Sequence, residues 1–263
     1  MRLVVPAAVG EAGTAELEDL YAAERPEWLR LGFVAALDGG VQLDGRSGGL
    51  SSPGDRLIFR LLRSVCDVIL VGAGTVRAEG YRDVDLPAEL RARRRARGGG
   101  DGPALAVVTG SGRLHDDGPL LGEGSGTRLV LLTTAAGRET AQAAGGPRAE
   151  VVVCGDERVD PAAALGALRA RGLAHVLCEG GPGLTSDLLR HGLVDDVCLT
   201  LAAVIAGSGA AHLTTGSPLP QPVRLDLAHL LEDDGTLLGR WRVASQPQLH
   251  THTSSRGAEG PAR

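Results

Sequence analysis

Short runs of consecutive apolar residues alternate along most of this chain with segments in which apolar residues recur every three or four positions. An apolar run without polar alternation is typical of a strand covered on both faces, and the longer spacing is typical of a helix with one buried face. Strands are expected at residues 31–37, 67–72, 104–109, 128–133, 151–154, 174–179 and 196–204. Helices are expected at 51–65, 86–97, near 138, at 161–171 and at 183–191. This alternation predicts βαβ units and a largely parallel sheet.

The pattern changes near the C-terminus. Segments 223–231 and 239–243 flank the turn-forming sequence Glu232-Asp-Asp-Gly235. Two such segments around a turn predict an antiparallel hairpin, which we expect at the edge of the sheet.

The stretch from Gly48 to Tyr81 joins a helix, a strand and a glycine turn without interruption. The serines at positions 51 and 52 can cap a helix that has one apolar face and continues to Val65. The strand that follows ends at Gly72-Ala-Gly-Thr75, which we expect to form a turn. This turn lies at the carboxyl end of its strand, where open α/β sheets bind their ligands.

The length of 263 residues allows one large domain with extensions. We expect an N-terminal extension over residues 1–25 and one domain over residues 26–245. Residues 246–263 have few large apolar side chains and are expected to be a disordered tail.

Composition excludes several classes of protein. Aromatic residues make up 2% and the net charge is −5, so a nucleic-acid-binding surface is not expected. No apolar run approaches the roughly 18 residues of a membrane span, and the N-terminus lacks a secretory signal. The four cysteines are far apart and form no CxxC pair, so we expect buried thiols, no metal site and a cytoplasmic protein.

Two strand ends carry candidate chemistry. Glu179-Gly-Gly-Pro-Gly183 joins an expected strand to an expected helix, so its glycines can admit a phosphate to the free N–H groups of the helix. The same glycines can also serve simple close packing. Asp38 follows the first strand, either as a turn former or as a carboxylate at the mouth of a cleft.

Five motifs in order resemble the riboflavin-biosynthesis pyrimidine reductase family, the reductase domain of the bifunctional deaminase-reductase. They are Phe33-Val-Ala-Ala-Leu-Asp-Gly39, Gly45-Arg-Ser-Gly-Gly-Leu-Ser-Ser52, Leu62-Arg63, Asp67-Val-Ile-Leu-Val-Gly-Ala-Gly-Thr75 and Glu179-Gly-Gly-Pro182. The resemblance implies a dihydrofolate-reductase-like three-layer α/β fold, with a mostly parallel sheet, helices on both faces and a C-terminal antiparallel hairpin. It also implies NADPH-dependent reduction of 5-amino-6-(5-phosphoribosylamino)uracil to its ribitylamino product, and a homodimer is expected.

Site residues follow from the same resemblance. The positions implied for NADPH are Ala35, Thr75, Gly180, Gly181, Pro182, Gly183, Leu184, Thr185 and Ser186, with Ser111 and Arg113 for its 2′-phosphate. Ser47, Arg63 and Glu179 fall where the family holds its substrate, with Arg63 on the ribose phosphate. Taken from the residues alone, Arg63 could equally be a surface arginine, Ser47 a loop hydroxyl and Glu179 a helix cap.

Reduction of an opened ribosylamine requires a proton donor, and two carboxylates qualify. Glu79-Gly80-Tyr81 departs from the family pattern of an Asp, a short polar residue and Pro, so Glu79 is one candidate and Asp38 is the other. The chain has no HxE and PCxxC pair of a deaminase, so a stand-alone reductase is expected. The alternatives are a dihydrofolate or pterin reductase on the same fold, or a nucleotide-binding protein without turnover.

Overall fold

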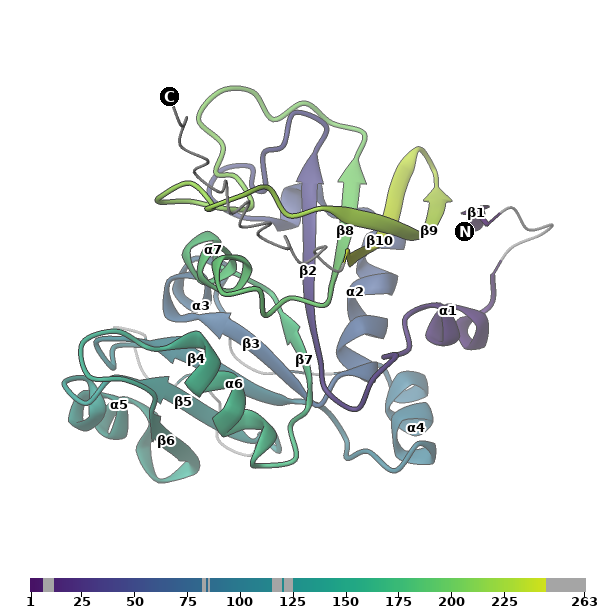
Figure 1. The fold of residues 1–263 in the computed structure, drawn as a ribbon. Coiled ribbons are helices and arrows are strands. Elements are labelled where there is room, and N and C mark those ends of the chain that lie inside the picture. Colours follow the sequence, from purple (N-terminus) through teal and green to yellow (C-terminus); the bar gives the residue numbers. More distant parts are fainter. Residues whose placement is uncertain (7–11, 82–83, 85, 115–119, 121–124, 245–263) are drawn as a thin grey trace, which may run out of the picture.

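The structure is a computed structural model that describes residues 1–6, 12–81, 84, 86–114, 120 and 125–244. Within these residues one sheet of ten strands has the order β1-β9-β10-β8-β2-β7-β3-β4-β5-β6 (Figure 1). The strands are β1 (Arg2–Val5), β2 (Trp28–Ala36), β3 (Val68–Gly72), β4 (Ala104–Thr109), β5 (Leu129–Thr133), β6 (Ala149–Val153), β7 (His175–Cys178), β8 (Asp196–Ala202), β9 (Leu225–Asp233) and β10 (Thr236–Val243). The helices are α1 (Thr14–Leu20), α2 (Pro53–Val65), α3 (Ala73–Glu79), α4 (Ala88–Ala96), α5 (Arg138–Gly145), α6 (Pro161–Arg169) and α7 (Pro182–Arg190), with 3-10 turns η1 (Gly48–Leu50) and η2 (Gly146–Arg148).

The sheet is parallel from β8 through β2, β7, β3, β4 and β5 to β6, and antiparallel where β10 pairs with β8 and β9. The mostly parallel sheet with its C-terminal hairpin is therefore confirmed. The turn of the hairpin is shorter than expected, because β9 continues to Asp233 and β10 begins at Thr236. It also does not form the edge, since β1 pairs with β9 on the outer side.

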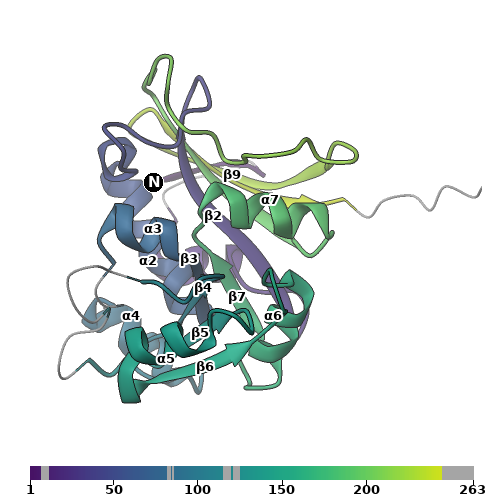
Figure 2. The ribbon, with the colours of Figure 1, turned by 90° about the vertical axis from the view of Figure 1, so that its left-hand side faces the viewer.

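Helices cover both faces of the sheet (Figure 2). Alternate residues of each strand enter opposite cores: Ile69 of β3 packs with α2, α3 and α5, whereas Leu70 packs with α6 and α7. Burial of both side-chain rows explains why the central strands have continuous apolar sequences. The expected layering is confirmed, and all four cysteines are buried as free thiols. Among the described residues, no helix has both the length and the apolar composition that crossing a membrane requires.

The expected turn at Gly72 to Thr75 is wrong, because helix α3 begins directly after Gly72. Gly72 is the N-cap and keeps an extended backbone, and the helix ends at Gly80 with φ of 70°. A φ in this range favours glycine, which explains the short helix between two glycines. Strand β3 thus passes into helix α3 without a loop.

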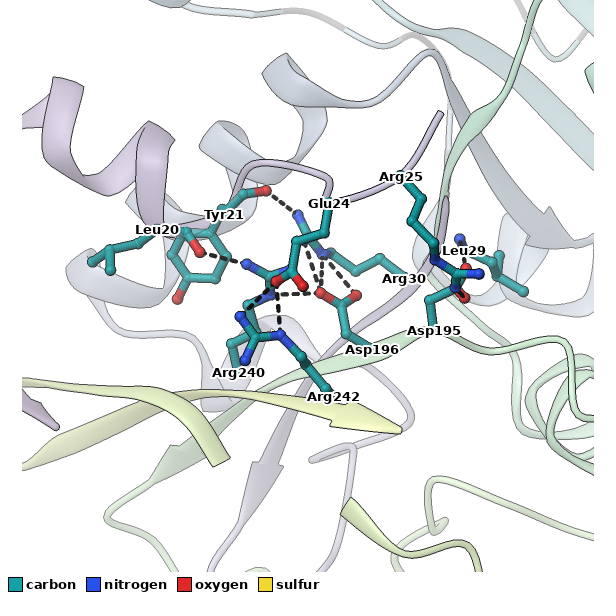
Figure 3. A network of polar contacts seen from close by, with 10 residues as sticks. All are labelled: Leu20, Tyr21, Glu24, Arg25, Leu29, Arg30, Asp195, Asp196, Arg240 and Arg242. Carbon is teal, nitrogen blue, oxygen red and sulfur yellow. Dashed lines mark hydrogen bonds and ion pairs between the residues drawn. The ribbon is translucent and has the colours of Figure 1, made fainter. Parts of the chain in front are cut away.

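A buried network fastens the segment before β2 to the sheet (Figure 3). Asp196 is fully buried and accepts hydrogen bonds from the guanidinium groups of Arg30 and Arg240. Arg30 also donates to the carbonyl of Tyr21, and Arg240 donates to that of Leu20, both at 2.7 Å. The end of α1 is thereby packed against the sheet, although it belongs to the expected N-terminal extension. The expected tail over 246–263 lies outside the described residues.

Candidate active site

A cleft of about 490 Å³ opens at the carboxyl ends of β2, β3 and β7. Its walls come from β2 and the residues after it, from the first two turns of α2, from both ends of α3 and from the first turn of α7. The residues predicted from sequence that line it are Ser47, Thr75, Glu79, Glu179, Gly181, Pro182, Gly183 and Leu184. These residues come from three separate segments, and the fold brings them to one edge of the sheet as open α/β sheets do.

A second cavity of about 420 Å³ lies beyond β4 and is lined by Ser111 and Arg113, as well as by Arg77 and Arg158. It shares Gly72, Gly74 and Leu184 with the first cavity. The two hollows therefore adjoin across the start of α3 and together form an elongated site. The first hollow is lined by three carboxylates and no arginine, and the second by three arginines and the two carboxylates of Glu157 and Asp187.

Glycines allow the ends of β3 and β7 to meet between the two hollows. The N–H of Gly72 donates to the carbonyl of Gly180 at 2.8 Å. A Cβ at Gly181 would lie 2.5 Å from Oγ1 of Thr75, which is closer than real Cβ contacts come. Helix α7 begins at this point without a side-chain cap, so the N–H groups of its first turn are available for an anion.

Glu179 stands at the end of β7 and is held by two other side chains. Arg63 of α2 donates to both carboxylate oxygens, with Nε to Oε1 and Nη2 to Oε2 at 2.8 Å each. The hydroxyl of Tyr81 donates to Oε2. Burial and the Glu179 charge raise the pKa of Tyr81 well above its usual value, so its hydroxyl stays protonated and acts as a donor. Arg63 is not among the lining residues of the cleft.

The two candidate acids have different surroundings. Glu79 lines the cleft, and its Oε1 accepts the backbone N–H of Ser47 at 2.9 Å. Asp38 is exposed and outside the lining of both hollows. The backbone N–H groups of Gly207 and Ala206 bond its carboxylate and lower its pKa. A carboxylate held in its charged form is a poor proton donor, so the geometry favours Glu79.

Several residues implied for the cofactor face the protein. Ala35, Gly180, Thr185 and Ser186 are outside the lining of both hollows. Oγ1 of Thr185 donates to the carbonyl of Gly181, and Oγ of Ser186 accepts the N–H of Thr215 at 2.9 Å. These hydroxyls shape the start of α7 and its contact with the following loop.

The cleft contains side chains that the sequence did not reveal as site residues. Asp55 is 6% exposed, lines the cleft and accepts a hydrogen bond from the hydroxyl of Ser51. Phe59 and Tyr81 line the same wall. Asp55 was recognisable only as a helix N-terminal residue, and Tyr81 only as a departure from a motif. The described lining thus holds three carboxylates, of Asp55, Glu79 and Glu179, and no arginine.

Together the fold and the cleft define an α/β protein with a mostly parallel sheet, helices on both faces and an elongated cavity at the carboxyl ends of its strands. The model of the RibD C-terminal domain family matches residues 27–238. The chain therefore belongs to the RibD C-terminal domain family, which confirms the resemblance seen in the motifs.

Two similar sequences carry the same name, 2,5-diamino-6-ribosylamino-4(3H)-pyrimidinone 5′-phosphate reductase. The protein of Archaeoglobus fulgidus is 33% identical over 181 residues, which is 68% of this chain and 82% of the relative. That of Methanothermobacter thermautotrophicus is 31% identical over 204 residues, which is 76% of this chain and 90% of the relative.

Solved structures agree in fold. A pyrimidine reductase-like protein from Corynebacterium diphtheriae has a TM-score of 0.74 at 24% identity, covering 88% of this chain and 99% of that one. The riboflavin biosynthesis reductase of Saccharomyces cerevisiae has a TM-score of 0.62 at 20% identity, covering 86% and 97%. At these identities the likeness establishes the fold alone.

Proposed function

We propose that this protein reduces a phosphoribosylamino-pyrimidine to its ribitylamino product in riboflavin biosynthesis. The observation that carries the proposal is the identity of more than 30% to two reductases, of which the chain covers 82% and 90%. The cleft supports it, because it offers hydrogen-bond acceptors for a small heterocycle and a carboxylate that can hold a proton.

NADPH is the proposed cofactor, and the elongated site fits it. Gly72 and Gly181 let the ends of β3 and β7 approach each other between the two hollows, and the uncapped start of α7 suits a pyrophosphate. Ser111 and Arg113 line the second hollow and would hold the 2′-phosphate. When bound, a nicotinamide supplies the two electrons and the hydrogen that C1′ of the opened ribosylamine receives.

The protein's own part is to orient the pyrimidine and to deliver one proton to the nitrogen on C1′. Glu79 is the proposed carrier of that proton, since it lines the cleft and Ser47 fixes one of its oxygens. Glu179 and Asp55 are proposed to accept hydrogen bonds from the ring. The described lining has no arginine, so the substrate phosphate would lie at the mouth of the cleft, away from these carboxylates.

Two pyrimidines are candidates, and they differ at position 2 of the ring. The uracil expected from the motifs has a carbonyl there, whereas the pyrimidinone in the relatives' name has an amino group. A carbonyl that faces a carboxylate cannot form a hydrogen bond with it, because both groups are acceptors. An amino group in the same place donates a hydrogen bond to the carboxylate. The acidic lining therefore supports the diamino compound as the preferred substrate.

Steady-state oxidation of NADPH by the purified protein tests the proposal. The assay compares the diaminopyrimidinone, the corresponding uracil and dihydrofolate at equal concentrations. Turnover of either pyrimidine with kcat/KM at least about 100-fold above that for dihydrofolate supports it, a difference of about 3 kcal/mol in transition-state stabilisation. Turnover of dihydrofolate alone favours the folate-reductase alternative, and binding of NADPH without turnover favours a nucleotide-binding protein.

A homodimer is proposed through the outer face of β9 and β10. Leu225 and Leu227 are 42% and 43% exposed, and in the hairpin register they stand opposite Val243 and Trp241. An apolar strip of this kind suits association with a second copy. Light scattering on the parent and on Leu227→Glu tests it, because the charge should convert a dimer to a monomer.

A cytoplasmic location is proposed as well. All four cysteines are free thiols, which suits a reducing compartment. Fractionation of cells that produce the protein tests this directly.

A further inference from the structure

Three side chains from distant segments meet at the inner wall of the cleft. Arg63 lies in the last turn of α2, Tyr81 follows the C-cap of α3, and Glu179 follows β7. The Glu179 side chain is 2% exposed and that of Arg63 is 18% exposed. Such a pair has lost most of its hydration, so its geometry matters more than that of a surface ion pair.

The guanidinium of Arg63 lies behind the cleft wall and directs its Nε and Nη2 groups at Glu179. It makes the paired contact with Glu179, and its Cζ lies 4.4 Å from the ring centre of Phe59 and 5.8 Å from that of Tyr81. Phe59 and Tyr81 belong to the lining, whereas Arg63 does not. A phosphate that took the paired contact with Nε and Nη2 of Arg63 would displace Glu179, and it would then lie beside a buried carboxylate that had lost its cation.

Glu179 keeps acceptor capacity on one side. A carboxylate offers about four acceptor positions on its two oxygens. Among the described residues, Oε2 accepts from Arg63 and from Tyr81, whereas Oε1 accepts from Arg63 alone. Since Glu179 lines the cleft, an N–H or O–H group of a bound ring can take the remaining position.

We propose that Arg63 and Tyr81 are positioning residues that hold the Glu179 carboxylate in one orientation as an acceptor for the pyrimidine, and that Arg63 is not the phosphate ligand. This inference rests on the proposed function. Tyr81 stands where the related motif has Pro, so the hydroxyl is a feature of this chain that the motif does not supply. With Tyr81 and Arg63 both bonded to it, Glu179 cannot rotate away when the cleft is empty, and binding the ring costs less ordering of side chains.

Removal of the substrate phosphate separates the two roles of Arg63. Calorimetry measures Kd of the ribitylamino product with and without its phosphate, for the parent, for Arg63→Ala and for Arg60→Ala. Arg60 is an exposed arginine of the same helix outside the cleft lining, and it serves as the matched control. We expect Arg63→Ala to weaken both ligands by the same factor, on the order of ten- to a hundred-fold. A loss confined to the phosphorylated ligand overturns the inference.

Tyr81→Phe provides a second test that keeps the ring and the shape of the wall. Its KM for the pyrimidine should rise about ten-fold, while KM for NADPH changes less than two-fold. In a Glu179→Gln background the same change should have an effect below two-fold, because Tyr81 acts through Glu179. Equal effects in both backgrounds overturn the inference. If the parent protein reduces neither pyrimidine, both the proposed function and this inference are wrong. If the parent reduces a pyrimidine but either test fails, only the inference is wrong.

Discussion

His229 of β9 should make the protein less stable in mild acid. It is 2% exposed, and its ring stands edge-on to Tyr21 at a centroid distance of 4.6 Å. Burial, followed by the charges of Arg240 and Arg30, lowers the pKa of His229 from 6.5 to about 4. The fold therefore favours the neutral ring, whereas the unfolded chain binds a proton below pH 6.5.

The direction of this pH effect on stability follows from proton linkage. Between pH 6.5 and 4 the unfolded state binds more protons, so the free energy of unfolding falls as the pH falls. Through the difference between its two pKa values, His229 lowers the free energy of unfolding by about 3 kcal/mol at pH 4 and below, and by about 2 kcal/mol at pH 5. For a chain of this size, 2 kcal/mol lowers Tm by roughly 4–8 °C.

Calorimetric Tm measurements at pH 7 and pH 5 on the parent and on His229→Phe test this value. Other groups also titrate in this range, so the readout is the difference between the two proteins. The parent should lose about 4–8 °C more than the variant between the two pH values. His191→Gln, a change on the surface, should behave like the parent. An equal loss in the parent and in His229→Phe would refute the assignment.

Three further predictions concern the elongated site. Gly181→Ala places a Cβ against Oγ1 of Thr75 and should raise KM for NADPH about ten-fold or more, whereas Gly166→Ala, on α6 outside both hollows and with open space around its Cβ, should leave it within two-fold; equal KM values would place the dinucleotide elsewhere. Glu79→Gln should lower kcat by roughly a hundred-fold or more, and a larger loss in Asp38→Asn would instead identify Asp38 as the acid. Arg113→Ala should weaken NADPH but not NADH, by on the order of ten-fold in fluorescence titrations, and a parent that binds both equally would remove the 2′-phosphate assignment.

The sequence predicted the sheet well because each central strand is buried on both faces and therefore apolar throughout, as in Val68 to Val71. It missed helix α3, because glycines at 72 and 74 suggested a turn, whereas tertiary packing of Val76 makes the segment helical. Local signals were thus overridden where a short segment is held by its neighbours.

The candidate site was predictable only in part. Glycine motifs indicated the strand ends that form it, because they report a local backbone requirement. The ion pair of Arg63 with Glu179 joins residues 116 positions apart, so the motif that suggested a phosphate ligand could not show the guanidinium already engaged. Asp55 enters the cleft through the orientation of α2, which no local pattern encodes.

The most direct test of the central claim is where the hydrogen from the cofactor goes. The protein is incubated with the phosphoribosylamino-diaminopyrimidinone and NADPH carrying deuterium at the transferable position of C4, and the product is analysed by NMR and mass spectrometry. The proposed function predicts a ribitylamino product with one deuterium at C1′ and an unlabelled pyrimidine ring. A deuterium in the ring, or consumption of NADPH without a ribitylamino product, would contradict it.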